Sequence, residues 1–540
     1  MVIQDINRCL MRLQDRAERI SSKQVAETFV SVGPLLDLLG SHNNQIMYGR
    51  RGTGKTHALR FFQVQRNLEG DIALYLDAQN IGSNGSIYND STIPVSERAT
   101  RLLVDVCSFV HHELLEIFTA QNSVWDLSKA APILDRFVDH FTETRVSGPL
   151  EVEHNEKSAV SQKSSASASV SGGFTRGPAF DGRFGQDNSN SAEGSSRVKV
   201  SGTEDCWIDF NYFSQAIRAL AEFVEPKRLW LLIDEWTTVP SDIQPYLADL
   251  IRRAMFSVPN ITVKVAAIEH RANFKRDFPN EDYIGFELGA DISASINLDD
   301  YLVIDNNQAR AKDFFRTFIG NHASAVATEL GLDLGSANGI VGLAFTQDNV
   351  FTEFVRATEG VPRDAMHILA LAAQHANAVQ ISMSVIRAAS YAFFQMEKYN
   401  AIQSNRANSL LLDWIRDEVI SNRRTRAFLL PVSTDDVIID RLFDRRALHI
   451  LNRNRSAAHR PGERFVVYKL DYGLYVDLAS TDKYPAGLLI DEALGEDVDF
   501  DVPLDDARSY RRAILDLGKF YEAHPELVDS TPILGQANLL

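Results

Sequence analysis

Cysteine is scarce in this chain: Cys9, Cys107 and Cys206 are the three in 540 residues. They show no CxxC spacing and no even-numbered disulfide framework. The sequence also lacks an apolar run of membrane-spanning length. The first twenty residues carry polar side chains throughout, unlike a secretory signal. These absences exclude a cysteine-based zinc site and lead us to expect a cytoplasmic protein with no membrane partner.

An excess of positive charge is also missing. Lys and Arg number 55 against 72 Asp and Glu, so the formal net charge is −17. This balance argues against a protein whose whole surface binds nucleic acid. The charge is uneven, however, because the segment from Ala479 to Leu540 has 13 acidic and 5 basic residues. A local basic surface elsewhere is compatible with the composition.

The pattern of apolar residues divides the chain into several domains, as its length requires. Residues 44–305 alternate strand and helix patterns, which predicts an α/β domain whose parallel sheet has helices on both faces. Around it we expect N-terminal helices and a linker (1–43), a helical lid domain (306–404), a winged-helix domain (405–478) and an acidic C-terminal tail (479–540).

Residues 147–205 interrupt the α/β pattern with a segment rich in Ser and Gly. Such a composition is typical of a disordered surface insertion. Two stretches within it, SASASVSGG and SRVKVSG, alternate with a period of two, which is the pattern of a strand. The alternative is therefore a hairpin, with these stretches as its arms, that becomes ordered in an assembly.

The stretch GRRGTGKT matches the phosphate-loop pattern GxxxxGK[ST] and lies between an apolar strand and a helix-forming run. Its glycines let backbone N–H groups approach phosphate oxygens, and the following helix directs its positive end at the same anion. Lys55 would neutralise the β- and γ-phosphates, and the Thr56 hydroxyl would bind Mg²⁺. The predicted ATP contacts are Gly49, Arg50, Arg51, Gly52, Thr53, Gly54, Lys55, Thr56 and His57.

An acidic pair follows the apolar run LWLLI, which has the composition of a strand buried on both faces. Asp234 would bind Mg²⁺, commonly through water, and Glu235 would activate the attacking water. Glu235 matters because a scaffold that only binds a nucleotide has no need for a base. The sequence therefore predicts ATP hydrolysis as well as binding.

The stretch ATEGVPRDAMHI adds a third element, in which Arg363 begins a helix of the all-helical region. An arginine there can contact the γ-phosphate of ATP. Through this contact, the angle between the lid and the α/β domain can depend on whether the γ-phosphate is present. With the loop GRRGTGKT, the acidic strand LLIDEW, this lid motif and the expected winged helix, the chain resembles an AAA+ ATPase of the origin-recognition (initiator) type. The resemblance spans roughly residues 25–478.

The resemblance implies Walker roles for Lys55, Thr56, Asp234 and Glu235, and a sensor-2 role for Arg363. Family members carry a polar sensor-1 residue, often Asn, after the next strand. This chain departs from that pattern, because Glu269 or His270 occupies the position. The resemblance also implies an arginine finger that acts on a neighbouring subunit. The candidates are Arg271 and Arg276, with Arg252 and Arg253 on the preceding helix as alternatives, although a solvated basic helix end explains all four equally well.

By the same resemblance, ATP between subunits would support a homo-oligomeric ring or filament that acts on DNA or a nucleoprotein complex. ATPases of this build also occur in prokaryotic mobile-element and anti-phage systems beside an effector protein. Arginines in the winged-helix region could contact DNA phosphates, although a solvated loop explains them equally well. They are Arg423, Arg424, Arg426, Arg453, Arg455 and Arg460. The alternatives are a nucleotide-gated switch that recruits a partner protein without DNA, and a scaffold that keeps ATP for stability.

Overall fold

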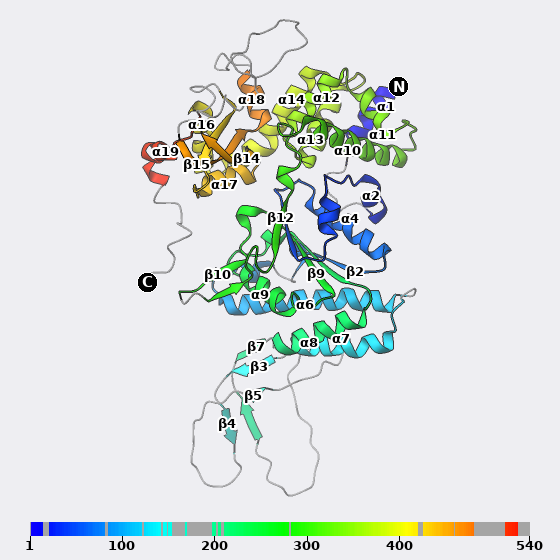
Figure 1. The fold of residues 1–540 in the computed structure, drawn as a ribbon, viewed down its shortest axis with the longest axis vertical. Helices are drawn as coiled ribbons and strands as arrows, with labels where there is room; N and C mark the ends of the chain where they lie inside the picture. The colour runs from blue at the N-terminus through cyan, green and yellow to red at the C-terminus, as the bar shows by residue number, and fades with distance from the viewer. Residues whose placement is uncertain are drawn as a thin grey trace.

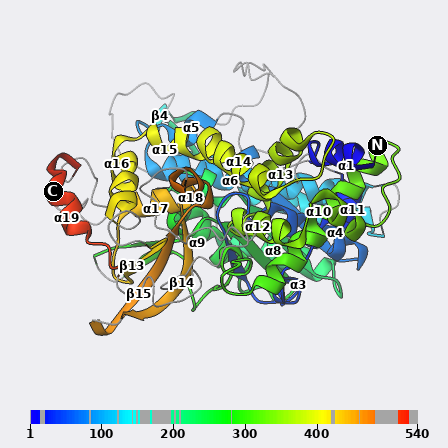
Figure 2. The ribbon, with the colours of Figure 1, turned by 90° about the horizontal axis from the view of Figure 1, so that it is seen from above.

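The computed structural model describes residues 2–13, 21–81, 85–120, 124–141, 144–147, 150–153, 168–169, 197–200, 203–206, 210–279, 282–418, 425–457, 460–479 and 513–527. A layered α/β domain occupies the middle of the molecule, and two further domains lie above its sheet (Figure 1). Seen from above, these two domains lie side by side (Figure 2).

The central sheet has five parallel strands in the order β12–β1–β9–β8–β2. Their bounds are β1 Gln45–Tyr48, β2 Ile72–Asp77, β8 Leu229–Asp234, β9 Ile261–Ala267 and β12 Ser293–Asn297. Strands β8 and β9 are buried at every position, which explains their continuous apolar sequences. The predicted parallel α/β fold is confirmed. Because the strands are parallel, the ends of β1, β9 and β8 meet at one edge of the sheet.

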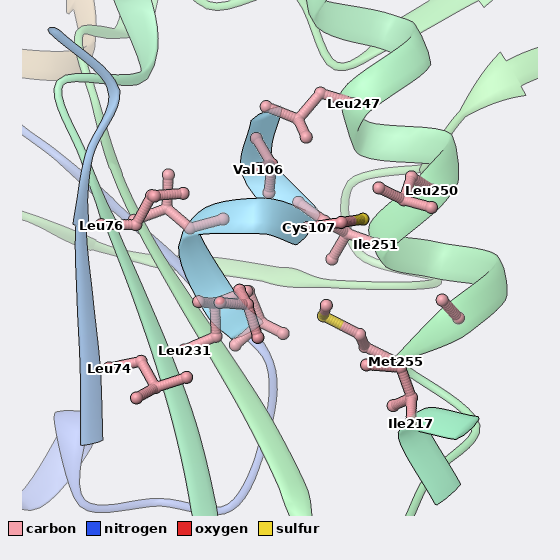
Figure 3. Packing of buried hydrophobic residues seen from close by; sticks show 14 of the residues in the cluster. Leu74, Leu76, Val106, Cys107, Ile217, Leu231, Leu247, Leu250, Ile251 and Met255 are labelled. Carbon is pink, nitrogen blue, oxygen red and sulfur yellow. The ribbon is translucent and has the colours of Figure 1, made fainter. Parts of the chain in front are cut away.

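Helices cover both faces of this sheet. They are α4 Lys55–Leu68, α5 Gly85–Asn89, α6 Val95–Thr119, α7 Leu127–Phe141, α8 Phe210–Phe223 and α9 Gln244–Ala254. Helix α4 packs Leu59 and Phe62 against Trp230 on one face. On the other face, Val106 and Cys107 of α6 meet sheet residues and α9 (Figure 3). A short antiparallel pair, β10 Lys275–Asp277 and β11 Tyr283–Gly285, lies beside α9.

The Ser/Gly-rich segment contributes short antiparallel strands where the structure describes it. They are β3 Thr144–Ser147, β4 Leu150–Glu153, β5 Ala168–Ser169, β6 Arg197–Val200 and β7 Thr203–Cys206. The pairs are β3 with β7, β3 with β5, and β4 with β6. In this single chain the two predicted arms therefore pair with the segment just after α7 and not with each other. A hairpin that becomes ordered in an assembly stays a prediction. The rest of the segment lies outside the described residues.

The lid domain is helical, as predicted. Its helices are α10 Gln308–Glu329, α11 Ala337–Ala344, α12 Asp348–Ala357, α13 Pro362–Ala376, α14 Met383–Phe393, the π-helical η6 Phe394–Tyr399 and α15 Asn400–Gln403. The N-terminal helix α1 (Val2–Leu10) buries Ile6 and Leu10 in the lid core. Helices α2 (Ser22–Thr28) and α3 (Leu35–Leu39) lead into β1. The N-terminal segment thus holds the lid and the sheet together.

The C-terminal domain combines helices with a three-stranded antiparallel sheet in the order β13–β15–β14. Its elements are α16 Arg406–Ile415, β13 Ala427–Pro431, α17 Val437–Asp444, β14 Leu448–Ala457, β15 Arg460–Leu470, α18 Tyr472–Ala479 and α19 Leu517–Ala523. Along the chain the domain therefore runs helix, strand, helix and hairpin. Its identity as a winged helix stays a prediction.

Two features of the C-terminal region differ from what its sequence pattern indicates. The stretch YGLYVDL forms helix α18 and not a strand, because Tyr472 turns into the lid core and ends the hairpin. Part of the expected tail also belongs to this domain. Leu429 exchanges backbone hydrogen bonds with Ala513 and Leu515, and Phe520 is fully buried. These contacts fix residues 513–527 on the domain despite the acidic composition around them.

Across the described ranges, every helix is too short or too polar to cross a membrane.

Candidate active site

A cavity of about 460 Å³ lies between the phosphate loop, the segment before β1, and the lid helices α10 and α13. Loop residues 51–57 line one part of it, together with Asp77, Glu235 and Arg363. Apolar and aromatic side chains line another part, namely Phe29, Val30, Val32, Leu35, Phe314, Phe318 and Met366. A polar region beside an apolar one is suited to a ligand with a charged group and a flat apolar ring system.

The phosphate loop depends on glycine at two positions. Gly52 and Gly54 have φ values of 89° and 97°, in the left-handed region that other residues rarely adopt. A Cβ on Gly52 would lie 2.8 Å from the Cβ of Arg363. The backbone N–H of Arg363 also donates to the Gly52 carbonyl at 3.2 Å. The lid therefore contacts the loop directly, and Arg363 lies at the cavity as the sequence predicted.

Lys55 is buried at the base of the loop. Its Nζ atom donates to the carbonyl oxygens of Gly49 at 2.7 Å and Arg50 at 3.0 Å. Burial lowers the pKa of Lys55, whereas the nearby carboxylates of Asp234 and Glu235 raise it. The ammonium group is thus held inside the curve of the loop and stabilised by acidic neighbours, where it can meet phosphate oxygens.

The acidic pair at the end of β8 divides into two roles. Asp234 is fully buried and accepts hydrogen bonds at 2.8 Å from the Tyr75 hydroxyl and from the backbone N–H of Glu235. Glu235 lines the cavity, with a φ of 51° that is unusual for a non-glycine residue. Burial and the Asp234 charge raise the pKa of Glu235. Such a carboxylate has the position and basicity of a general base.

The oxygen donors beside the loop fit Mg²⁺, which prefers hydroxyl, carboxylate and water ligands. Thr56, Asp77 and Glu235 line the cavity together. Asp234 lies behind them and is held by Tyr75, so it would reach a metal through water. Its role as a magnesium ligand stays a prediction. In the described ranges, no group of three or more His, Cys, Asp or Glu side chains is arranged to hold a metal ion by itself.

Arg50 was expected to contact the nucleotide, and the structure contradicts this for its side chain. Arg50 does not line the cavity. It is buried, pairs with Asp299 at 2.7 Å, and donates to the Leu448 carbonyl at 2.9 Å and to His449 Nδ1 at 3.2 Å. Its guanidinium also lies 4.3 Å from the ring centre of Phe443. A buried guanidinium needs partners for its donors, and the C-terminal domain supplies them.

Gly49 likewise does not line the cavity. It continues the sheet, because its N–H donates to the Ala267 carbonyl at 3.2 Å. A Cβ on Gly49 would lie 2.5 Å from the Thr53 hydroxyl oxygen, which explains the glycine. Thr53 itself lines the cavity and donates to the Arg50 carbonyl at 2.9 Å. The predicted contacts from Arg51 to His57 are therefore brought together, and those at 49 and 50 are not.

Arg50 is one end of a larger cluster that we call the buried ionic network. Its members are Arg50, Asp299, Asp364, Lys398, Arg446, His449 and Asp471. Lys398 Nζ lies 2.6 Å from Asp471 and 2.8 Å from Asp364. Burial would raise the pKa of Asp364, but Arg446 and Lys398 lower it to about 2. Because Asp364 follows Arg363, the network joins the loop and the lid to the C-terminal domain.

The sensor and finger candidates lie away from the cavity of their own chain. Glu269 contacts Arg453 at 3.0 Å, and His270 contacts Asp440 at 3.2 Å. Arg271 pairs with Asp444 at 2.5 Å. Arg276 lies on β10, with its guanidinium 5.8 Å from the Phe278 ring centre. The alternatives Arg252 and Arg253 both pair with Asp249. An action of any of them on a second subunit stays a prediction.

The candidate DNA contacts have different surroundings. Arg426 is 8% exposed and lies 3.6 Å from Asp305, so it is an internal residue. Arg453 is bound to Glu269 and Asp300 of the α/β domain. Arg460 is exposed on β15 beside Glu463, and Arg455 is half-buried on β14. Figure 2 shows this hairpin extending from the domain. Arg423 and Arg424 lie outside the described residues.

The apolar part of the cavity was missed by the sequence analysis. On α10, Phe314, Phe318 and His322 are spaced by four residues and therefore share one face. The spacing was visible in the sequence, but it equally fits a helix that faces only the lid core. Only the position of α10 beside the phosphate loop distinguishes a helix face that lines the cavity from one that packs in the lid core.

Residues 14–72 match the family model described as ORC-CDC6-like, and this segment includes β1, the phosphate loop and most of α4. No curated protein matches significantly. A Walker-type ATPase of Pyrococcus abyssi is 12% identical, with 87% of this chain and 100% of that chain covered and a TM-score of 0.35.

The Orc1 protein of Aeropyrum pernix, solved in complex with DNA, is also 12% identical, with 88% and 97% covered and a TM-score of 0.28. Both TM-scores are below 0.5, so we infer no function from either likeness. The fold and the loop geometry agree with the family match. The chain has the α/β fold of a P-loop ATPase, and its predicted resemblance to the origin-recognition type is confirmed by the ORC-CDC6-like match over residues 14–72.

Proposed function

We propose that this protein binds ATP with Mg²⁺ and hydrolyses it. One observation carries the proposal: Lys55, Thr56, Glu235 and Arg363, from three separate parts of the sequence, line one cavity. Any one of them has an ordinary structural explanation. Their convergence beside a loop of left-handed glycines is what phosphate binding and phosphoryl transfer require.

The residues divide the chemistry among them. The loop N–H groups and Lys55 hold the phosphates, and Arg363 brings a second positive charge from the lid. Glu235 orients a water for attack on the γ-phosphorus and takes its proton. Bound Mg²⁺ would neutralise charge on the phosphate oxygens, held by Thr56 and reached by Asp234 through water. A neighbouring subunit's arginine, from Arg271 or Arg276, would complete the site in a homo-oligomer.

Glu235→Gln tests hydrolysis separately from binding. The amide keeps the size of the side chain but cannot accept the proton of the attacking water. We expect ATP affinity within about threefold of wild type and a hydrolysis rate reduced by about 100-fold or more, the usual range for a lost general base. Glu97→Gln is the matched control, because Glu97 pairs with Arg101 on the exposed side of α6 and does not line the cavity. Equal ATP hydrolysis by Glu235→Gln and wild type would falsify the assignment.

We further propose that ATP-bound oligomers act on DNA or a nucleoprotein complex, in the setting of a prokaryotic mobile-element or anti-phage system with an effector protein. The ORC-CDC6-like match and the arginines of the β14–β15 hairpin support the DNA part of this proposal. Stimulation of ATP hydrolysis by duplex DNA, lost as salt rises, is the expected result. The double variant Arg455→Ala and Arg460→Ala should show a weaker stimulation by DNA. An ATP hydrolysis rate that does not respond to DNA at low salt would contradict an action on DNA.

A second candidate function is a nucleotide-gated switch that recruits a partner protein without DNA. The buried ionic network favours it, because Arg50 of the phosphate loop is held by Leu448 and His449 of the C-terminal domain. A partner protein bound to the C-terminal domain could therefore respond to a change in the conformation of the phosphate loop. Binding of a candidate effector that changes with ATP, together with no DNA response, would select this function.

A further inference from the structure

Two imidazoles lie at the apolar part of the cavity, and their hydrogen bonding differs. His57 Nε2 is 3.2 Å from the Val25 carbonyl and 3.4 Å from the Thr28 hydroxyl, so its N–H has acceptors in the chain. His322 is 6% exposed, and its Nε2 has no hydrogen-bond partner among the described residues. A buried nitrogen without a partner is costly unless another group bonds to it.

His322 is held in place by aromatic neighbours. Its ring centre is 4.5 Å from that of Phe318 and 5.9 Å from that of His57, which in turn packs edge-on against Phe29. Burial and the neighbouring His57 lower the pKa of His322 to about 3. The side chain is therefore neutral at physiological pH, with one nitrogen that donates and one that accepts. It is a fixed, uncharged hydrogen-bonding group inside an aromatic lining.

The surrounding residues indicate which base such a group would meet. Val30, Val32, Leu35, Phe314 and Met366 offer no side-chain hydrogen bonds. Guanine carries more polar atoms on its edge than adenine and would leave more of them unmatched here. Aromatic rings and one imidazole nitrogen that has no partner among the described residues suit a purine with one exocyclic amino group.

We propose that His322 is the specificity-determining residue for the nucleobase, and that its Nε2 hydrogen-bonds the polar edge of adenine. The proposal rests on the proposed function, because it names how the same site recognises its nucleotide. The α and β phosphates are held elsewhere, by the loop. His322 should therefore contribute to the binding of ATP and not to the binding of a bare triphosphate chain.

Equilibrium binding of fluorescent ATP, with ATP, GTP and inorganic tripolyphosphate as competitors, tests this. His322→Phe keeps a ring against Phe318 but removes both nitrogens, and His322→Gln keeps a hydrogen-bonding nitrogen. For His322→Phe we expect ATP affinity to fall about tenfold, the scale of one or two lost hydrogen bonds, and tripolyphosphate affinity to stay unchanged. His322→Gln should recover about half of the loss on the free-energy scale. His375→Phe, an exposed histidine of α13, is the control.

The possible outcomes separate the two proposals. If wild type binds neither ATP nor tripolyphosphate, the proposed function itself is wrong. If wild type binds both, and His322→Phe binds ATP as tightly as wild type, only the base contact is wrong. A parallel loss of ATP, GTP and tripolyphosphate in both His322 variants would also overturn it, because that pattern reports a distorted cavity. Thermal unfolding of each variant verifies that the fold is kept.

Discussion

Two clusters of charged side chains each include a residue of the stretch GRRGTGKT. They differ in what their charges face. In the cavity, Lys55, Glu235 and Arg363 face a common space. In the buried ionic network, Lys398 lies between Asp364 and Asp471, and the guanidinium of Arg50 hydrogen-bonds to Asp299 and His449. Charges that face a space can bind a ligand, whereas charges that face each other hold domains together. The difference separates binding residues from structural ones better than sequence position, since Arg50 and Lys55 share one motif.

The largest expected effect on binding comes from the cavity cluster. Lys55→Ala removes the ammonium group at the base of the loop and should lower ATP affinity by about 100-fold or more, because charge-assisted hydrogen bonds to phosphate are lost. Thermal stability should change little. Lys227→Ala is the matched control, because Lys227 also donates to a backbone carbonyl, that of Glu69, away from the cavity. Unchanged ATP affinity in Lys55→Ala would show that the loop does not bind phosphate.

The largest expected effect on stability comes from the network. Lys398→Met leaves Asp364 and Asp471 buried without their shared cation, which should cost about 3–5 kcal/mol of unfolding free energy. ATP affinity should fall less than in Lys55→Ala, since Lys398 does not line the cavity. Lys312→Met, which breaks a pair with the exposed Asp348, should cost less than about 1 kcal/mol. Denaturant unfolding measures both, and equal costs would contradict a structural role for the network.

A smaller effect is expected where the two clusters meet. Gly52→Ala would place a Cβ 2.8 Å from the Cβ of Arg363 and strain a φ of 89°. Displacing the lid arginine should lower ATP affinity by about tenfold, the equivalent of roughly 1.4 kcal/mol. Gly331→Ala is the control for backbone strain alone, because its φ is 65° and its Cβ would meet nothing within 4 Å. If both variants bind ATP like wild type, the loop and Arg363 are not coupled.

A last effect, of about the same size per histidine as the change expected for Gly52→Ala, is a pH dependence shared by the two clusters. Burial lowers the pKa of His322 in the cavity to about 3, and that of His449 in the network well below its usual value. The unfolded chain binds these protons near pH 6.5 and the folded chain only at lower pH. Stability should therefore be highest above about pH 6.5 and fall as the pH decreases, by roughly 1.4 kcal/mol per histidine at pH 5.5.

His322→Gln tests that pH dependence, because a glutamine does not titrate. Unfolding midpoints at pH 7.5 and 5.5 should differ less in this variant than in wild type. A difference of the same size in both proteins would mean that His322 does not titrate on unfolding.

Much of the site could be predicted from short stretches of sequence. Lys55 and Thr56 follow the glycine-rich turn after β1, and Asp234 and Glu235 lie at the end of β8, so the local pattern identifies both pairs. Parallel strands that end at the same edge of a sheet bring the two pairs together. Arg363 was found because Pro362 marks the start of a helix. For these residues the local sequence pattern was sufficient to predict the conformation.

The amino-acid sequence by itself determined the five-strand sheet, the helical lid and the phosphate loop, because hydrophobic period and glycine placement act locally. Tertiary structure alone decided that Arg50 turns from the loop to His449, 399 residues further on, and that His322 faces the cavity. Neither follows from spacing. The reason is physical: the direction of a long polar side chain depends on where its hydrogen-bond partners lie, and here they lie on separate domains.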